Sequence, residues 1–546
     1  MRIALAQIET AVGDLEGNAR RIVGAIEEAR RARADLVAVP ELAVPGYPPL
    51  DLLLEPGFVE ENRRVLLEGI APAAKGIVAL VGFVDEDASR KTPAGTPVRY
   101  NAAAVLAEGR LAGISRKTLL PGYDVFFEPR YFAPAASRVA HDVAGTRLGV
   151  EICEDMWEEG YGCAVGRELA AAGARVLVNL SASPFTVGKP AARIELARKR
   201  AREADRPLLY VNAVGSEDGY EGQLVFDGSS FAVDRKGNLL ALGKSFEEDL
   251  LVVEIDPERG EGPPIAARPS SPVEELAGAL VLGMRIYARR NGFRSAVLGL
   301  SGGVDSALTA CLAVEAFGRE GVRALWMPSR FSSERSARDA AAVARNLGIG
   351  LRAVPIEEAF ETVRRTLGPE FEGADLALEN VQARLRGLFL MADSNRSGHL
   401  LLSTGNKTEL ALGYCTLYGD MAGGLAPLAD VSKREVYALA EKRKEIPASI
   451  LRAAPTAELR ADQVDPFDYA VVSPLVDALV EGRRTPEDLV REGYDRAVVE
   501  DCVCRLRAAE YKRRQAPPGI KVTGTAFGVG RRVPIAHSFR GPGRSA

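Results

Sequence analysis

The stretch from Ala296 to Ser306 constrains the fold of this chain more than any other. An apolar run, AVLGL, is typical of a buried strand, and it ends in Ser301-Gly302-Gly303 before the helical pattern ALTACLAVEAFG begins. Two adjacent glycines let the backbone turn sharply and bring its N–H groups close to a ligand. These groups and the N-terminus of the following helix would suit a phosphate. The stretch therefore predicts a strand, a phosphate-binding loop and a helix.

Asp305 stands inside this loop. A carboxylate repels phosphate unless a cation bridges the two, so the loop predicts a phosphate ligand accompanied by Mg²⁺. The spacing and the lysine of the G-x-x-x-x-G-K-[ST] loop are absent. The simpler alternative is a tight turn between a strand and a helix that binds nothing.

Strands and helices alternate after this loop. Helical patterns cover 307–318, 333–347 and 376–393, and strand patterns occur in VRALWMP, LRAVPI and HLLLSTGN. This order predicts an open, mostly parallel, Rossmann-like sheet with helices on both faces and ligands at the carboxyl ends of the strands.

One of these helices carries residues whose exposure the pattern also predicts. Its apolar side chains are expected in the core and its arginines on a solvated face. The apolar residues are Leu385, Leu388, Phe389 and Met391, and the arginines are Arg384 and Arg386.

The first half of the chain is a second α/β region. Apolar strands with interspersed helices run to about residue 257, and PERGEGPPIAARPSSP then has the composition of a linker. We expect domains at 1–257 and 273–546, joined by a linker at 258–272. The tail beyond Lys521 is expected to be partly flexible.

Composition excludes several classes of protein. The hydrophobic fraction of 47% and the charged fraction of 26% are ordinary for a globular protein, and the net charge of −4 gives no reason to expect a nucleic-acid partner. No uninterrupted apolar run reaches the length of a membrane span, so no membrane contact is expected. Six cysteines are too few for a disulfide framework in a chain of 546 residues, which favours a cytoplasmic location.

Three residues of the first half each follow a predicted strand: Glu41, Lys117 and Cys153. A cysteine attacks a carbonyl as its thiolate, and a neighbouring cation lowers the pKa of a thiol. A lysine can supply that cation and also stabilise an oxyanion, while a glutamate can accept the thiol proton. Together these groups would suit amide hydrolysis through a thioester. Taken singly, each is more often a core cysteine or a surface charge.

Three sequence blocks of the first half resemble the signature blocks of the nitrilase superfamily: VPELAVPGYP, SRKTLLPGYDVFFEPRYF and GVEICEDMW. This resemblance implies a four-layer αββα sandwich whose catalytic triad is Glu41, Lys117 and Cys153. Members that hydrolyse glutamine also imply glutamine contacts at Tyr123, Ser183 and Lys189. Glu128 corresponds to an additional glutamate often found beside such triads.

The second half resembles two nested families. The loop is similar to the pyrophosphate loop, SGG-x-DS, of ATP pyrophosphatases, and NVQARLR, STGNKTE and GYCTLYGDMAGG follow the order of the NAD synthetase family. The resemblance implies contacts to deamido-NAD at Asn380, Glu409 and Lys521, and Mg²⁺ near Asp305 and Glu409. It also implies contacts to ATP at the loop and one threonine: Gly299, Leu300, Ser301, Gly302, Gly303, Val304, Asp305, Ser306 and Thr404.

The order of the two halves resembles glutamine-dependent members of the NAD synthetase family. The resemblance implies that ammonia released from L-glutamine reaches deamido-NAD activated by ATP, through a sheltered passage, in a homo-oligomer that assembles through the second domain. Two alternatives stay open at this point. The chain could be another amidotransferase that uses the pyrophosphate loop, or a nucleotide-binding or glutamine-sensing protein without catalysis.

Overall fold

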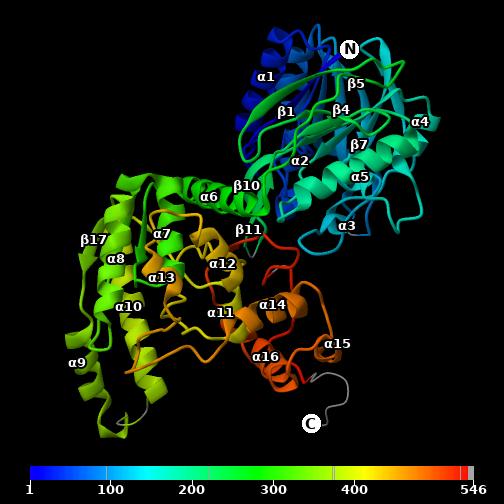
Figure 1. Ribbon diagram of the computed structural model, residues 1–546. Coiled ribbons are helices and arrows are strands. Elements are labelled where there is room, and N and C mark those ends of the chain that lie inside the picture. Colours follow the sequence, from blue (N-terminus) through cyan, green and yellow to red (C-terminus); the bar gives the residue numbers. More distant parts are fainter. Residues whose placement is uncertain (94, 221, 372, 374, 529, 539–546) are drawn as a thin grey trace. The chain divides into compact units, whose positions relative to one another are not determined.

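A computed structural model describes residues 1–93, 95–220, 222–371, 373, 375–528 and 530–538 of the chain (Figure 1). The chain divides into two units. The first contains Met1–Gly219 and Leu224–Ala279, and the second contains Tyr220–Gln223 and Leu280–Ala546. The division falls inside one helix, α6 (Pro272–Arg290). The last eight residues of the tail lie outside the described part, whereas Val522 is fully buried and Ala526 nearly so.

Two six-stranded sheets form the centre of the first unit. In the first sheet the strand order is β14 (Asp249–Glu254), β1 (Arg2–Gln7), β2 (Leu36–Ala38), β3 (Val78–Lys91), β4 (Pro97–Ala107) and β5 (Arg110–Arg116). In the second sheet it is β13 (Leu239–Leu242), β12 (Phe231–Val233), β9 (Leu208–Asn212), β8 (Val176–Ser181), β7 (Thr146–Ile152) and β6 (Ala140–Val143). The first unit also contains β10 (Val214–Asp218) and most of β11 (Gly222–Asp227), whose first two residues belong to the second unit and pair there with β19 (Gly519–Ile520).

Helices cover the outer face of each large sheet. One apolar cluster lies between the two sheets, with Leu5 from one and Val178 from the other. A second cluster joins the first sheet to α1 (Leu15–Arg31), and a third joins the second sheet to α4 (Val165–Ala171) and α5 (Lys189–Ala204). The result is the four-layer αββα sandwich expected from the sequence. The remaining helices of this unit are α2 (Phe58–Arg64) and α3 (Glu128–Tyr131).

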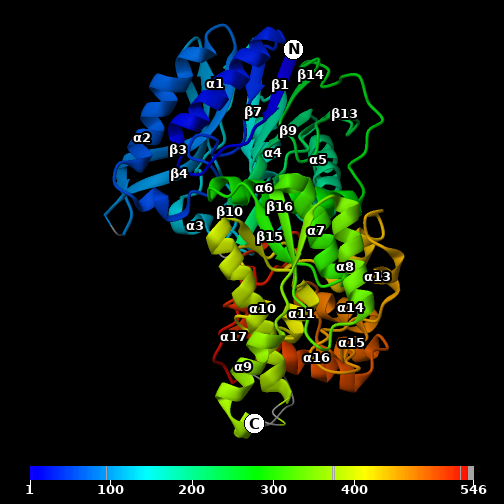
Figure 2. The ribbon, with the colours of Figure 1, turned by 90° about the vertical axis from the view of Figure 1, so that its left-hand side faces the viewer.

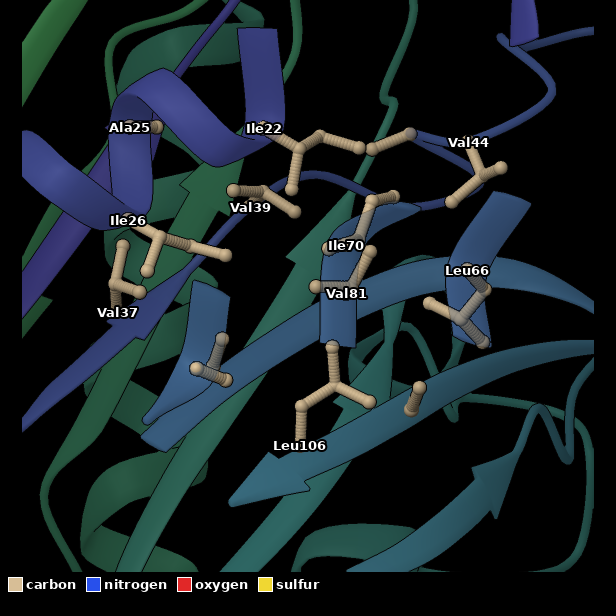
Figure 3. Packing of buried hydrophobic residues seen from close by; sticks show 14 of the residues in the cluster. Ile22, Ala25, Ile26, Val37, Val39, Val44, Leu66, Ile70, Val81 and Leu106 are labelled. Atoms are coloured by element: carbon tan, nitrogen blue, oxygen red, sulfur yellow. The ribbon is translucent and has the colours of Figure 1, made fainter. Parts of the chain in front are cut away.

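Helix α1 shows how the sequence produces one of these layers. The side chain of Asp14 caps its first turn by accepting from Gly17 N at 2.9 Å, and Arg30 and Arg31 lie in its last turn, where the helix dipole favours positive charge. Ile22, Ala25 and Ile26 point from one face onto strand residues such as Val37 and Val81 (Figure 3). This spacing gives the helix a single apolar stripe, which packs on the sheet.

A four-stranded parallel sheet forms the centre of the second unit, in the order β17 (Gly350–Ala353), β16 (Val322–Trp326), β15 (Ala296–Gly299) and β18 (Leu400–Leu402). Helix α10 (Asp375–Ser397) lies on one side of β15 and β16, and α7 (Val304–Phe317) and α8 (Glu334–Leu347) lie on the other (Figure 2). The Rossmann-like arrangement expected from the sequence is therefore confirmed. Its strands β15 and β18 are apolar and almost fully buried, as is typical of a parallel sheet covered on both faces, whereas the edge strand β17 is mostly exposed.

Shorter helices complete the second unit. They are α9 (Glu357–Leu367), α11 (Lys407–Leu412), α12 (Lys433–Ala440), α13 (Ala448–Arg452), α14 (Tyr469–Val480), α15 (Pro486–Arg491), α16 (Arg496–Ala508) and α17 (Glu510–Arg513). Of the helices in the described part of the chain, none combines the length and apolar character needed to cross a membrane.

Two expectations about α10 are wrong. Leu388 is 59% exposed and Met391 is 37% exposed, whereas Leu385 is buried. Arg386 does not extend into solvent, because its Nε donates to the carbonyl of Met327 at 3.0 Å. The periodic pattern located the helix but could not show which part of its surface the sheet covers.

Candidate functional sites

Glu41, Lys117 and Cys153 meet in the first unit although they are far apart in the chain. Glu41 follows β2, Lys117 follows β5, and Cys153 follows β7. Lys117 Nζ lies 2.7 Å from Glu41 Oε1 and 2.7 Å from Glu128 Oε1, and the lysine is fully buried. We call Glu41, Lys117, Glu128 and Cys153 the thiol site.

The charged groups of the thiol site are buried. Burial alone would lower the pKa of Lys117, but the carboxylates of Glu128 and Glu41 raise it well above its ordinary value, so the lysine stays charged. Burial raises the pKa of Glu128 to about 7, with repulsion from Glu41 adding to the effect and Lys117 opposing it. Asn101 Nδ2 donates to Glu41 Oε1 at 2.7 Å, and Ala182 N donates to Glu41 Oε2 at 2.9 Å. These contacts fix the Glu41 carboxylate in place.

Cys153 differs from the expectation that a nearby lysine lowers the pKa of its thiol. Burial raises the pKa of its thiol well above the ordinary value, and the negative charge of Glu41 adds to this, while Lys117 opposes it only in part. The resting form is therefore the thiol. Cys153 also has φ of 45°, in the left-handed region that a residue other than glycine rarely adopts. Strain of this kind is common at functional sites.

Two of the predicted glutamine contacts, Tyr123 and Lys189, interact with a carboxylate that the sequence did not single out, Glu154. Tyr123 donates from its hydroxyl to Glu154 at 3.0 and 3.1 Å, and Tyr161 donates to the same carboxylate at 2.9 Å. Lys189 begins α5 and its charge lowers the pKa of Glu154, which burial raises overall. Ser183 is buried, and its N–H donates to Asn212 Oδ1 at 3.0 Å. Glu154 thus provides a negative group in the residue next to Cys153.

Asp155 connects the segment of Lys117 to the segment of Cys153. Its Oδ1 accepts from the N–H groups of Thr118 at 3.0 Å and Leu119 at 2.8 Å, and its Oδ2 accepts from Ile152 N at 3.0 Å. Burial raises the pKa of this carboxyl to about 6, against the opposing effect of these backbone donors. One buried side chain therefore sets the distance between the residue after Lys117 and the residue before Cys153.

A cavity of about 310 Å³ opens over the loop in the second unit, and we call it the loop cavity. The whole of Gly299–Ser306 lines it, together with Thr404, Glu409 and Lys433. Gly302 has φ of 86°, and a Cβ there would come within 2.5 Å of the carbonyl oxygen of Ser336, so only glycine fits. The hydroxyls of Ser301 and Ser306 lie 3.1 Å apart and hold the turn closed.

Asp305 is held from two directions at the edge of this cavity. Asn406 Nδ2 donates to its Oδ1 at 2.8 Å, and Lys433 Nζ lies 2.6 Å from its Oδ2. The same ammonium lies 3.1 Å from Glu409 Oε1. Burial tends to lower the pKa of Lys433, but Asp305 and Glu409 raise it well above the ordinary value. The two carboxylates therefore share one permanent positive charge.

Two different protein families match the two halves of the chain. The carbon-nitrogen hydrolase family profile matches residues 2–262, and the NAD synthase profile matches residues 276–516. The chain is 44% identical to a glutamine-dependent NAD(+) synthetase of Synechocystis sp., with 99% of each chain covered, and 38% identical to one of Thermotoga maritima with the same coverage. The chain belongs to the glutamine-dependent NAD(+) synthetase family.

A solved structure of this family has the same fold. The structure is a glutamine-dependent NAD(+) synthetase of Acinetobacter baumannii in complex with ADP, at 36% identity and a TM-score of 0.77, with 98% of each chain covered. The nitrilase and NAD synthetase resemblances in the sequence are therefore confirmed at the level of family and fold.

Not all of the residues expected to contact the dinucleotide reach the loop cavity. Glu409 lines it directly, and Asn380 lies one residue behind, since its Oδ1 accepts from the hydroxyl of Thr416, which does line it. Lys521 is 4% exposed, lies outside the cavity wall, and donates from Nζ to the carbonyl of Thr523. The expectation that Lys521 contacts the dinucleotide stays a prediction.

The Mg²⁺ expected in this family can be tested against the residues present. Among the described residues, no group of three or more His, Cys, Asp or Glu side chains is arranged to hold a metal ion. The carboxylates of Asp305 and Glu409 nevertheless both lie next to the Lys433 ammonium, at 2.6 and 3.1 Å, and burial raises the pKa of Glu409 to about 7 with a further contribution from Asp305. Such a pair fits Mg²⁺ when phosphate oxygens and water complete the shell.

Several residues of these sites had weak signals in the sequence. Arg335 and Arg386 also line the loop cavity, and in the described structure Arg335 Nη1 is buried without a hydrogen-bond partner. Asp155 and Glu154 lie within the ICEDMW block, so their proximity to Cys153 could have drawn attention to them. Arg386 was expected on a solvated face of its helix, and the sequence pattern around Arg335 indicated only a helix.

Proposed function

We propose that this chain makes NAD from deamido-NAD and ATP, with ammonia taken from L-glutamine, and releases AMP, pyrophosphate and glutamate. The observation that carries the proposal is the presence, in one chain of this family, of a buried Cys–Lys–Glu centre and of a separate cavity floored by a phosphate-type loop. The first supports acyl transfer through a thioester, and the second supports binding of a nucleotide phosphate.

In the first step the Cys153 sulfur attacks the side-chain amide of glutamine. Because the resting group is a thiol, its proton must leave during the attack, and we propose Glu41 as the acceptor. Lys117 stays charged and stabilises the tetrahedral oxyanion. Ammonia departs with a proton returned by Glu41, and water then releases glutamate from the thioester. We propose that Tyr123, Ser183 and Lys189 bind the glutamine.

In the second step the nicotinate carboxylate of deamido-NAD attacks the α-phosphorus of ATP. We propose that the loop and Thr404 hold the ATP phosphates, with backbone N–H groups and the ammonium of Lys433 facing the negative charge of the pyrophosphate. Asn380, Glu409 and Lys521 are the proposed dinucleotide contacts. Ammonia then displaces AMP from the adenylated carboxylate.

We propose Asp305 and Glu409 as the residues that hold Mg²⁺ beside the phosphates. The bound ion would neutralise charge on the departing pyrophosphate. The proximity of these two carboxylates in the wall of the loop cavity is the observation in support, and loss of metal binding in equilibrium dialysis of Asp305→Asn is the measurement that checks it.

Product analysis tests the proposed reaction. Incubation of the chain with glutamine, ATP and deamido-NAD should release AMP, pyrophosphate, glutamate and NAD in equal amounts. Omission of deamido-NAD should stop AMP release. AMP release with a different acceptor carboxylate, and none with deamido-NAD, would indicate another amidotransferase, and the absence of any turnover would indicate a binding protein.

Asp155 gives a prediction for the first half-reaction. Asp155→Asn has the same size but leaves at least one buried backbone N–H of the Lys117 or Cys153 segment without an acceptor. We expect glutamine-dependent kcat/KM to fall by a factor of roughly 5 to 150, equivalent to about 1–3 kcal/mol for an unsatisfied buried donor. Synthesis from ammonium chloride should not change. Steady-state kinetics with both nitrogen sources would measure this.

The pH dependence provides a second readout for Asp155. The carboxyl has a pKa of about 6 and accepts these bonds fully only when ionised, so wild-type glutaminase activity should decline as the pH falls through about 6. In Asp155→Asn this part of the decline should disappear. Asp142→Asn, at an exposed position of the same unit, is the matched control. If kcat/KM and its decline at low pH are both unchanged in Asp155→Asn, Asp155 does not have this role.

We also propose that the chain forms a homo-oligomer through its second domain. Leu376, Leu388 and Met391 are exposed on α10, and such apolar side chains favour contact with another surface. Analytical ultracentrifugation of Leu388→Lys should show a smaller species than wild type. The domain limits of 1–257 and 273–546 and a cytoplasmic location are kept as proposals, testable by limited proteolysis and cell fractionation.

A further inference from the structure

One arginine in the wall of the loop cavity, Arg335, has no part in the reaction described above. It is the second residue of α8, and its side chain is partly exposed. In the described part of the chain its Nη1 is buried and has no hydrogen-bond partner. A buried donor without an acceptor is costly, so we expect this guanidinium to turn toward an acceptor when a ligand fills the cavity.

The backbone of α8 places Arg335 beside the phosphate-type loop. A Cβ at Gly302 would lie 2.9 Å from the Cα of Ser336 and 2.5 Å from its carbonyl oxygen, so the loop packs directly on the first turn of α8. Consecutive Cα atoms are about 3.8 Å apart, which puts the Cα of Arg335 within about 7 Å of the same point. An extended arginine side chain covers that distance. The guanidinium can therefore reach a phosphate bound to the N–H groups of the loop.

The other two positive groups of this wall are already held by protein atoms. The ammonium of Lys433 lies between two carboxylates, at 2.6 and 3.1 Å. The Nε of Arg386 donates to the carbonyl of Met327 at 3.0 Å. Arg335 differs from both, because neither an ion pair of its side chain nor a hydrogen bond of its Nη1 occurs in the described residues. Its charge is therefore available to a ligand.

The carboxylates that line the loop cavity have partners other than Arg335. Glu458, the one that contacts α8, accepts at Oε1 from the hydroxyls of Ser333 and Ser336, both at 2.7 Å, and at Oε2 from Ser333 N at 3.2 Å. The others accept from lysine, asparagine, tyrosine or backbone groups, and they are Asp305, Glu409, Asp420 and Asp465. These carboxylates outnumber the positive groups of the wall. A phosphate chain must therefore be held here by individually placed donors rather than by a general positive field.

We propose that the Arg335 guanidinium binds the two terminal phosphates of ATP and the pyrophosphate formed from them. This inference rests on the proposed function, because it assumes ATP in the loop cavity. The planar fork of a guanidinium donates to two phosphate oxygens at once. When the carboxylate of deamido-NAD attacks the α-phosphorus, the bond to the bridging oxygen breaks and its electron pair stays on the pyrophosphate. Arg335 therefore stabilises the leaving group more strongly than the bound substrate.

Calorimetric titration of the full chain with pyrophosphate, and separately with AMP, tests this role. The variant is Arg335→Gln, and the matched control is Arg338→Gln, an exposed arginine of the same helix that does not line the cavity. We expect the Kd for pyrophosphate to rise by about tenfold or more in Arg335→Gln, as for loss of a charged donor, and to stay unchanged in Arg338→Gln. The Kd for AMP should stay unchanged in both.

The outcomes of this titration separate the role of Arg335 from the proposed function. An unchanged Kd for pyrophosphate in Arg335→Gln, or a larger loss of AMP binding than of pyrophosphate binding, would overturn the role of Arg335 alone. If the wild-type chain bound neither ligand, the proposed function would fail and this inference with it.

Chemical rescue distinguishes contact with the phosphates from support of the fold. In Arg335→Ala we expect kcat/KM for ATP to fall, with ammonium chloride as the nitrogen source, and guanidinium chloride at low concentration to restore part of it. Urea at the same concentration has a similar shape but no charge and should restore nothing. Glutaminase activity, which belongs to the other unit, should be unchanged and verifies folding. Equal effects of guanidinium and urea would contradict the proposal.

Discussion

Replacement of Cys153 by alanine is expected to abolish NAD formation from glutamine and to leave formation from ammonium chloride near the wild-type rate. The substitution removes the atom that forms the thioester, and loss of a nucleophile from a catalytic unit costs at least about 10³-fold in rate. The second half-reaction uses the loop cavity, whose wall residues all belong to the second unit. Ammonium chloride should therefore restore NAD formation in the Cys153→Ala protein.

Cys163→Ala is the matched control for this experiment. Cys163 lies ten residues further along the same unit, is partly exposed, and has no role in the thiol site. Rates with each nitrogen source would be measured for both variants, with circular dichroism to verify folding. Equal loss of both activities in a folded Cys153→Ala protein would contradict the division of labour between the units.

Replacement of Asp305 by asparagine is expected to remove synthesis from either nitrogen source. The asparagine has the same shape, but Lys433 loses one of its two carboxylate partners, and Asn406 Nδ2 faces a group that can donate as well as accept. The ammonium would then shift toward Glu409 and away from the loop. Loss of one placed electrostatic group in an active site costs on the order of 10²–10³ in rate.

Glutaminase activity supplies the internal control for Asp305→Asn, because the thiol site lies in the other unit and should still hydrolyse glutamine. Asp501→Asn, an exposed residue of the second unit paired with Arg505, controls for the change of charge. Synthesis near the wild-type rate in Asp305→Asn would exclude this residue from the reaction, and the proposed role of Lys433 would then need another partner.

The pKa shifts of Cys153 and Lys117 refine the proposed attack on glutamine. From residue types alone we expected Lys117 to lower the pKa of the Cys153 thiol and a glutamate to accept its proton, whereas burial and the charge of Glu41 raise that pKa. The proposed attack on glutamine therefore includes the transfer of this proton to Glu41. Lys117 Nζ lies 2.7 Å from a carboxylate oxygen of both Glu41 and Glu128. These carboxylates keep the lysine charged, as its proposed role toward the oxyanion requires.

The sequence alone determined the local elements, the two kinds of domain and the candidate site residues. Strand and helix patterns depend on neighbouring residues, so β15, its loop and α7 could be recognised from a few consecutive positions. The same holds for Cys153 at the end of β7 and Glu41 after β2. Family resemblance then assigned the reaction, because short motifs in a fixed order are specific in combination.

Only the tertiary structure decided which charges meet and what their environment does to them. Lys433 joins Asp305 across 128 positions, and Arg116 and Arg90 meet over Tyr100, through contacts that no periodic pattern encodes. The exposure of Leu388 and the hydrogen bond from Arg386 to the carbonyl of Met327 depend on where α10 lies against its sheet. Burial and electrostatic coupling arise from the packing of distant segments, so protonation states follow from the fold rather than from residue types.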